Sequence, residues 1–366
     1  RFEQVVKVIH VQIIESRLQL DVCVINTLID MYAKIGDLVH SRKVFEGSCT
    51  RDVVTWSAMI GGYVQHGCAT EALNLFNKMQ QSHVEVDRVT CLSCLKACSS
   101  IGTGAHGKLI HGLVIEMGLE LDISIGNALI DLYTSSACLE DACKVFDSIL
   151  KRDVVTWTTM ILGHNKFEQE HMALVLFSEM IKQGLRPDNI VFIGILKACG
   201  SLRSLRDGKL VHANIVENSF EIDIGLNNTL IDMYSNCRSR EDACKVFSTM
   251  PKQDTITWNA MIAGCFQCNS YELAWRKYEE MQHANMKPDN VTFLSLLSGC
   301  SNQGLVVRGY DIFKSMREHH GLEPTIDHCN CIADLLGRVG DVEEAEDVLK
   351  AGESGSNVIG WTSLLS

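Results

Sequence analysis

Apolar residues recur along the chain at the spacing of amphipathic helices, in pairs of short segments. Between residues 53 and 87, Trp56, Met59, Ile60 and Tyr63 follow the i, i+3, i+4, i+7 pattern of one helix face. Gly67, a residue type that often ends helices, follows, and a second amphipathic segment comes after it. The apolar positions of this second segment are Ala72, Leu73, Leu75, Phe76 and Met79. The pattern predicts a helix-turn-helix hairpin.

This hairpin pattern repeats along the chain. The similar blocks VVTWSAMI, VVTWTTMI and TITWNAMI contain Trp56, Trp157 and Trp258, which are 101 residues apart. Recurring aspartates divide each 101-residue unit into segments of 35, 35 and 31 residues. These aspartates are Asp52, Asp87, Asp122, Asp153, Asp188, Asp223, Asp254 and Asp289. One hairpin cannot bury both of its apolar faces, so the sequence predicts an all-α solenoid of stacked hairpins.

Composition narrows the class of protein. The 366 residues are 46% hydrophobic and 21% charged with only four prolines, which favours a folded helical chain. No apolar run approaches the roughly 20 residues of a membrane span, so we expect a soluble protein. The net charge of −12 argues against a binder that relies on bulk positive charge. The ends, Arg1 and Ser366, favour a fragment, so no compartment is inferred from targeting signals.

The sixteen cysteines raise the possibility of zinc or disulfides. Two CxxC pairs exist, Cys91 with Cys94 and Cys265 with Cys268, but no second pair lies at the spacing of a zinc finger. Three other cysteines recur at matching helical positions, as small hydrophobic residues would: Cys98, Cys199 and Cys300. We therefore predict packing rather than metal binding, in a reducing compartment.

Segments of 35 residues with a V-V-T-W opening, an A-L-x-L-F-x-x-M second helix and a closing P-D closely resemble pentatricopeptide repeats. The P-D closings are Pro187–Asp188 and Pro288–Asp289. Tetratricopeptide repeats have a different period and signature. The rotation of 31, 35 and 35 residues resembles the plant-type subclass of short, standard and long repeats (PLS), whose members act mainly in organelle RNA editing. The resemblance implies a right-handed superhelical solenoid with a concave groove.

The resemblance also implies a register. Residues 1–21 end a long repeat, and successive repeats start at 22, 53, 88, 123, 154, 189, 224, 255 and 290. A short repeat follows at 326–357, and residues 358–366 resemble the start of the C-terminal extension of editing factors.

In this family the fifth and the last residue of a repeat together recognise one base of single-stranded RNA. Asn, Ser and Thr can donate or accept at the edge of an unstacked base, and a carboxylate can orient them or accept through water. Carried over, the pairs are Asn26–Asp52, Ser57–Asp87, Asn127–Asp153, Thr158–Asp188, Asn228–Asp254, Asn259–Asp289 and Asn330–Asn357. The long repeats have Leu92, Ile193 and Leu294 at the fifth position, which leaves their bases unassigned. The implied target is 5′-U-G-N-U-G-N-U-U/C-N-Y, with an edited cytidine a few nucleotides downstream.

Two further positions are implied by the resemblance. The second residue of a repeat clamps the base, and here the candidates are Val54, Val89, Val155, Ile190, Ile256 and Val291. The thirteenth residue contacts phosphate, and the basic candidates are Lys34, Lys166 and Arg338. So few cations predict modest affinity and a shallow salt dependence.

Competing interpretations exist for the same residues. Asp and Asn favour helix caps and turns, which explains the aspartates without any ligand. Capping does not explain why the fifth position is polar in short and standard repeats yet aliphatic in long ones. A groove in an acidic solenoid also suits a peptide partner, and an acidic groove throughout would favour that alternative.

No enzymatic signature is present in the sequence. The combined H-x-E and P-C-x-x-C signature of zinc deaminases is absent, since none of the four prolines precedes a cysteine, and no Ser-His-Asp or phosphate-loop motif occurs in a supporting context. His106, His111 and His212 are interpreted as ordinary surface or core residues. We therefore expect no catalysis, cofactor, metal, membrane or small-molecule substrate. The expected partners are an RNA transcript, accessory editing proteins and a deaminase in trans, in a mitochondrion or chloroplast by resemblance.

Overall fold

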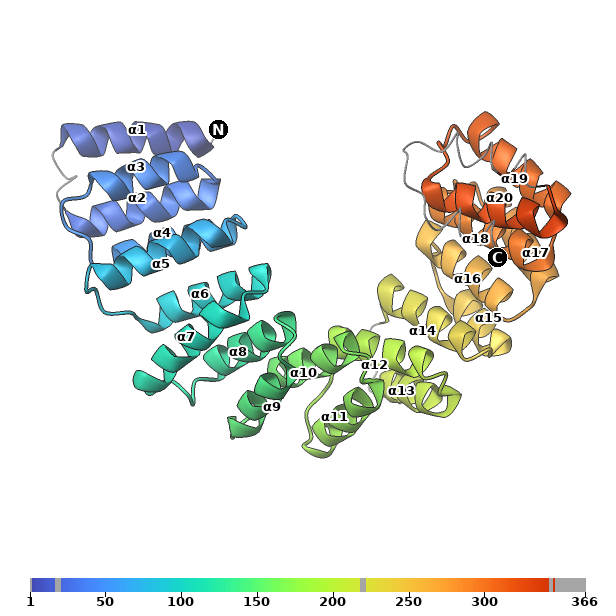
Figure 1. Ribbon diagram of the computed structural model, residues 1–366, viewed down its shortest axis with the longest axis horizontal. Coiled ribbons are helices and arrows are strands. Elements are labelled where there is room, and N and C mark those ends of the chain that lie inside the picture. Colours follow the sequence, from blue (N-terminus) through green and yellow to red (C-terminus); the bar gives the residue numbers. More distant parts are fainter. Residues whose placement is uncertain (1, 17–20, 218–221, 342–344, 346–366) are drawn as a thin grey trace. The chain divides into compact units, whose positions relative to one another are not determined.

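A computed structural model describes residues 2–16, 21–217, 222–341 and 345. In these residues the regular secondary structure consists of twenty α-helices and no strand (Figure 1). The helices are α1 (Phe2–Glu15), α2 (Val22–Ile35), α3 (Leu38–Gly47), α4 (Val53–Gln65), α5 (Ala69–Gln81), α6 (Arg88–Ile101), α7 (Gly104–Glu116), α8 (Ile123–Ser135), α9 (Leu139–Ser148), α10 (Val154–Lys166), α11 (Glu170–Lys182), α12 (Asn189–Ser201), α13 (Leu205–Glu217), α14 (Ile224–Asn236), α15 (Arg240–Thr249), α16 (Thr255–Gln267), α17 (Tyr271–His283), α18 (Asn290–Gln303), α19 (Val306–Glu318) and α20 (Ile326–Val339).

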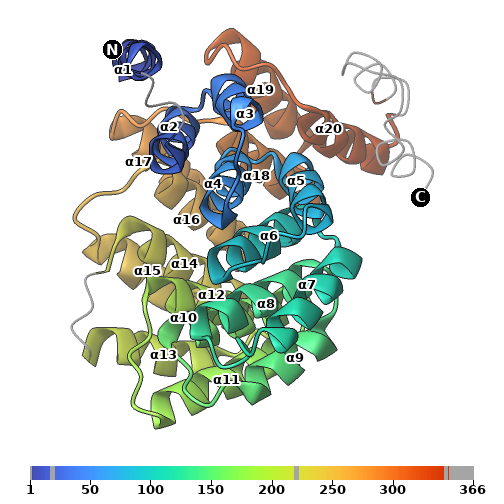
Figure 2. The ribbon, with the colours of Figure 1, turned by 90° about the vertical axis from the view of Figure 1, so that its left-hand side faces the viewer.

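The chain forms two compact units, residues 1–191 and 192–366. In each unit the first helices of successive hairpins pack on one another: α2, α4, α6, α8 and α10 in one, and α14, α16, α18 and α20 in the other. The second helices lie beside this stack, as Figure 2 shows for α5, α7 and α9 next to α4, α6 and α8. The predicted stack of helical hairpins is confirmed within each unit.

Aspartate side chains determine where the first helices begin. The Asp52 carboxylate accepts from the backbone N–H and the hydroxyl of Thr55, which forms a capping box at the start of α4. The same capping box starts α10, α16 and α18. The first helices α4, α6, α8, α10, α14, α16 and α18 thus begin one residue after an aspartate, at repeat starts of the sequence register. The capping interpretation of the aspartates is confirmed.

The core lies between the apolar faces predicted from the sequence. Met59 and Ile60 of α4 and Met79 of α5 are fully buried, and Trp56 is nearly so. Cys98, Cys199 and Cys300 are also fully buried, and this burial raises the pKa of the Cys199 thiol to about 12. Their thiols therefore stay protonated and pack as small hydrophobic groups, as predicted.

Among the residues that the structure describes, no group of three or more His, Cys, Asp or Glu side chains is arranged to hold a metal ion. None of the helices in the same residues is long and apolar enough to cross a membrane.

Glycines set the spacing between some of the first helices. A Cβ on Gly163 of α10 would lie 2.5 Å from Thr134 Cγ2 of α8, and one on Gly62 of α4 would lie 2.7 Å from Ala33 Cβ of α2. Helix α4 therefore approaches α2, and α10 approaches α8, as closely as only glycine permits. This contact fixes the distance between successive layers of the stack.

A partly buried histidine–tyrosine contact recurs between neighbouring helices, namely α1 and α2, α7 and α8, and α13 and α14. The histidine Nδ1 lies 2.8–2.9 Å from the tyrosine hydroxyl in each case. The three contacts are His10–Tyr32, His111–Tyr133 and His212–Tyr234. The prediction that His111 and His212 are ordinary surface or core residues does not include this contact, although each histidine precedes its tyrosine by 22 residues.

These histidines predict an acid-sensitive stability. Burial lowers the pKa of His111 and His212, although Asp141 and Glu120 near His111 and Asp242 near His212 oppose the shift. The unfolded imidazole has a pKa of about 6.5, so it binds protons before the folded one does. The contribution to stability is therefore complete above about pH 6.5 and is lost as the pH falls below it. Thermal melting should show a midpoint that is steady from about pH 8 to 7 and falls between about pH 6.5 and 5.

The double variant His111→Phe/His212→Phe is the matched control. Phe313 occupies the equivalent position of α19. The variant should reduce the fall in melting midpoint between about pH 6.5 and 5 without removing it, because burial also lowers the pKa of His10, His164 and His320, which remain. An unchanged acid transition in the variant would assign the effect to other groups.

Candidate nucleic-acid interface

The second residue of each standard and long repeat is an exposed aliphatic side chain. All six predicted clamp residues are 51–63% exposed. They are Val54, Val89, Val155, Ile190, Ile256 and Val291. Exposed β-branched side chains at regular intervals along the first helices offer apolar surface to a flat ligand.

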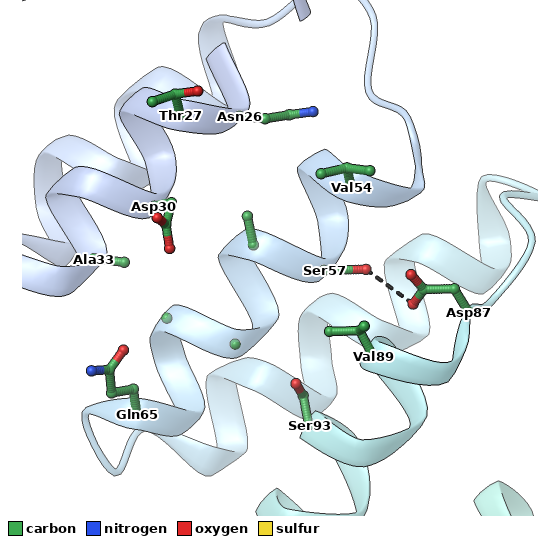
Figure 3. A pocket seen from close by; sticks show the side chains of 13 residues that line it. Asn26, Thr27, Asp30, Ala33, Val54, Ser57, Gln65, Asp87, Val89 and Ser93 are labelled. Atoms are coloured by element: carbon green, nitrogen blue, oxygen red, sulfur yellow. Dashed lines mark hydrogen bonds between the residues drawn. The ribbon is translucent and has the colours of Figure 1, made fainter. Parts of the chain in front are cut away.

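A hollow of about 610 Å³ opens over α2, α4 and α6 and contains a predicted recognition pair. In Figure 3, the Ser57 hydroxyl points at the Asp87 carboxylate, with Val54 and Val89 nearby on the same wall. A hollow of about 450 Å³ lies over α12, α14 and α16 in the second unit, but its lining includes no predicted recognition pair or clamp residue. Polar pairs and exposed aliphatic residues thus share one face of the first helices.

The predicted pairs are brought together across successive hairpins. Asn26, Asn127 and Asn259 each donate their amide N–H to the paired Asp Oδ1, at 3.2, 3.3 and 2.9 Å. Asn228 is hydrogen-bonded to Asp254. The Ser57 hydroxyl lies 2.7 Å from the Val53 carbonyl oxygen and 3.2 Å from Asp87 Oδ1, so its contact with the aspartate is the longer of the two. Thr158 also donates to a carbonyl of its own helix, that of Val154, at 2.6 Å, and Asp188 accepts from the backbone N–H of Val191.

One carboxylate oxygen performs all of these tasks. Oδ1 of Asp52 accepts from Asn26 and from both the N–H and the hydroxyl of Thr55. Oδ1 of Asp87, Asp153 and Asp289 has the corresponding partners. Within the described parts of the chain, no hydrogen bond reaches Oδ2 of these four aspartates. The carboxylate therefore caps a helix, holds the fifth residue and keeps one acceptor free.

The aspartates are ionised at neutral pH. Partial burial raises the pKa of Asp52, Asp153 and Asp254, but hydrogen bonds from the capping threonine and from the paired asparagine outweigh it and lower the pKa overall. The free oxygen is consequently an acceptor and not a donor.

The fifth residues are less exposed than the sequence suggested. Ser57, Thr158, Asn228 and Asn259 are only 5–8% exposed, so these side chains lie mostly between layers at the margin of the groove. Direct contact with a base therefore requires the side chain to rotate.

The cost of that rotation differs between repeats. In Asn26, Asn127 and Asn228 the amide oxygen is buried and has no hydrogen-bond partner in the described structure. Rotation of these amides gives up a single hydrogen bond. Asn259 also accepts from the Thr292 hydroxyl at 2.5 Å, so its rotation gives up two.

The candidate phosphate contacts are partly neutralised. Lys34 forms an ion pair with Asp30 at 2.7 Å, and Arg338 forms one with Asp334 at 3.0 Å. Lys166 Nζ lies 3.5 Å from the carbonyl of Thr134. The groove carries both signs of charge.

The last predicted pair is not placed, because Asn357 lies outside the described residues, as does most of 342–366.

Comparison with known proteins identifies the repeats. The model of the PPR repeat family matches residues 51–100, 152–201 and 253–302, and the PPR repeat model matches 24–49, 127–154, 228–254, 291–320 and 327–351. The chain belongs to the pentatricopeptide repeat family.

Curated relatives extend this family membership across the chain. Pentatricopeptide repeat-containing protein At2g33680 of Arabidopsis thaliana is 36% identical over 98% of this chain and 49% of its own length. Two other Arabidopsis relatives, At1g11290 and At1g06140, are 34% identical over 95% and 98% of this chain, and over 43% and 64% of their own lengths. The former is named chloroplastic and the latter mitochondrial. The chain spans about half the length of the curated relatives it matches.

Solved structures confirm the fold expected for the family. The pentatricopeptide repeat protein PPR10 from maize matches with a TM-score of 0.69 at 18% identity, over 100% of this chain and 54% of that one. PPR10 in complex with an 18-nt psaJ RNA element matches with a TM-score of 0.73 at 16% identity, over 97% of this chain and 54% of that one. The predicted all-helical solenoid class is therefore confirmed.

Proposed function

We propose that the protein binds single-stranded RNA in a sequence-specific manner, with one base recognised by each short or standard repeat. The observation that supports this most is the free Oδ2 acceptor of the groove aspartates beside exposed Val and Ile side chains. Family membership and the RNA bound to maize PPR10 support the same proposal.

The geometry suggests how a base is recognised. A base inserted between Val54 and Val89 packs its faces on aliphatic side chains, while its edge meets Ser57 and Asp87. A guanine edge presents two N–H donors, and an ionised carboxylate accepts both well. A uracil edge alternates acceptor, donor and acceptor, which suits an asparagine amide beside the free carboxylate oxygen.

The biological setting is the selection of an organelle transcript for cytidine-to-uridine editing. The rotation of short, standard and long repeats and the chloroplastic or mitochondrial names of relatives support this. Deamination in this proposal belongs to a partner or to a region beyond this chain, with accessory editing proteins assisting.

The first helices carry charges of both signs. The alternative of a peptide scaffold predicted a groove that is acidic throughout. Lys34, Lys166 and Arg338 lie on first helices of the stack, and two of them offset an aspartate there. Because Lys34 and Arg338 are already paired with aspartates, few phosphates can be neutralised, and the binding constant should depend only weakly on salt concentration.

A binding assay with matched RNAs tests the proposal. Fluorescence anisotropy should show binding of modest affinity between the purified chain and an RNA that contains U-G-N-U-G-N-U-U-N-Y. Replacing the uracils opposite Asn127 and Asn228 by guanines should weaken binding about a hundredfold, since each correct base contact contributes about 1–3 kcal/mol. The control moves the two guanines to the flanking sequence. Equal affinity for all of these RNAs would refute base recognition.

A further inference from the structure

Asp122, the last residue of the repeat that starts at 88, has different hydrogen-bond partners from the last aspartates of the neighbouring repeats. Arg88, the first residue of α6, donates Nε–H to Asp122 Oδ2 at 2.5 Å and an Nη2 N–H to Asp122 Oδ1 at 3.1 Å. Asp122 also caps α8 by accepting from the backbone N–H groups of Ser124 and Ile125. Both of its oxygens are thus engaged, and the Arg88 hydrogen bonds lower its pKa.

Arg88 reaches the place that a fifth residue occupies in other repeats. The fifth residue of this repeat is Leu92, which cannot hydrogen-bond to a carboxylate. Positions 88 and 92 are four residues apart and lie on the same face of α6, one turn from each other. The long Arg88 side chain therefore replaces the short polar side chain that contacts the closing aspartate elsewhere.

Arg88 therefore places hydrogen-bond donors where the neighbouring repeats have a free acceptor. Where the neighbouring aspartates keep a free acceptor, the Asp122 layer presents the remaining N–H donors of a guanidinium that is itself 45% exposed. The bidentate contact holds the guanidinium plane in a fixed orientation. Exposed Val89 on the same turn of α6 provides the apolar surface beside it.

We propose that Arg88, oriented by Asp122, gives the first complete long repeat its own base contact, which selects guanine or cytosine over adenine and uracil. The inference rests on the proposed RNA function. A guanidinium donates two parallel N–H groups, so it suits a base edge with two adjacent acceptors. Guanine offers O6 and N7, and cytosine offers N3 and O2. Adenine and uracil have no such adjacent pair.

The three long repeats supply an internal comparison. The residue equivalent to Arg88 is Asn189 in α12 and Asn290 in α18. Asparagine is therefore compatible with this position in the fold, and Arg88→Asn makes the first complete long repeat resemble the other two. Arg88→Lys keeps the charge and removes the planar pair of donors.

The test varies only the third nucleotide of the target, opposite this repeat. The unmodified chain should bind RNAs with guanine or cytosine there about tenfold more tightly than those with adenine or uracil. Arg88→Asn and Arg88→Lys should both lose this preference. Their melting midpoints should show that the hairpins remain folded.

The outcomes separate the inference from the proposed function. Discrimination opposite Asn127 must persist in both variants, and its absence from the unmodified chain would refute the proposed function itself. An unmodified chain that is indifferent to the third nucleotide, or an Arg88→Asn variant that keeps the preference, overturns the inference. A uniform loss of affinity in Arg88→Asn, restored by Arg88→Lys, would make Arg88 a phosphate contact and also overturn it.

Discussion

Replacing Asn127 and Asn228 together by threonine is expected to change the preferred nucleotide opposite those two layers from uracil to guanine. Threonine is the natural fifth residue at Thr158, in the hairpin that follows Asn127. Asp153 and Asp254 still accept from the backbone N–H groups of Thr156 and Thr257, so the caps of α10 and α16 are unchanged. A hydroxyl is smaller than an amide and leaves the carboxylate open to the two N–H donors of guanine.

The expected change is large because two layers contribute. With about 1.4 kcal/mol from each, the ratio of affinities for guanine and uracil RNAs should change by roughly a hundredfold or more. Competition between the two RNAs in an anisotropy assay measures that ratio directly. The control Asn127→Ala/Asn228→Ala should lose the uracil preference without gaining one for guanine. A threonine variant that still prefers uracil would contradict the assignment of these residues.

The helices could be predicted from the sequence because the same apolar spacing and the same helix-start residues recur in each repeat. Apolar spacing gave the buried faces around Trp56 and Met79, and the recurring aspartates gave the helix starts. Both depend on neighbours within one hairpin, which a one-dimensional pattern contains.

The candidate site was only partly predictable because it depends on contacts between hairpins. From the sequence, capping and base recognition are alternative roles for Asp52. In the structure Oδ1 caps α4 and Oδ2 stays free, so one side chain can have both roles. The burial of Ser57 and Asn259 depends on layer spacing, which glycines such as Gly163 set through a neighbouring helix. Periodicity along one helix contains no information about that distance.

Two kinds of contact were not predicted, and only the histidine–tyrosine contacts have a signal in the sequence. The histidines and tyrosines of the three partly buried contacts recur at a separation of 22 residues, in step with the 101-residue unit. Arg88 gives no such signal, because its equivalents are Asn189 and Asn290. A residue that differs from its equivalents in the other repeats indicates a role only once its contact partner is known. The partner of Arg88 is Asp122, which is 34 residues away in the sequence.

Replacing Trp157 by alanine is expected to destabilise the protein by about 3–5 kcal/mol, the usual cost of removing a buried aromatic side chain. Trp157 is 1% exposed and packs edge-on against Phe146 of α9, with ring centroids 5.0 Å apart. The Arg152 guanidinium lies 4.3 Å from the Phe146 centroid and completes the cluster. This cluster joins a short repeat to the following standard repeat, as Phe45–Trp56 and Phe247–Trp258 do elsewhere.

The damage should be local, because each hairpin of a solenoid contacts only its neighbours. Hydrogen exchange should accelerate most in α9 and α10, while the amides of α4 and α5 retain their protection. Trp157→Phe, which keeps an aromatic ring against Phe146, should lose clearly less stability. Uniform acceleration along the whole first unit would show instead that its hairpins unfold as one cooperative block. Because α10 is capped by Asp153, the partner of Asn127, loosening this junction should also weaken discrimination at the nucleotide opposite Asn127 more than at the one opposite Asn26.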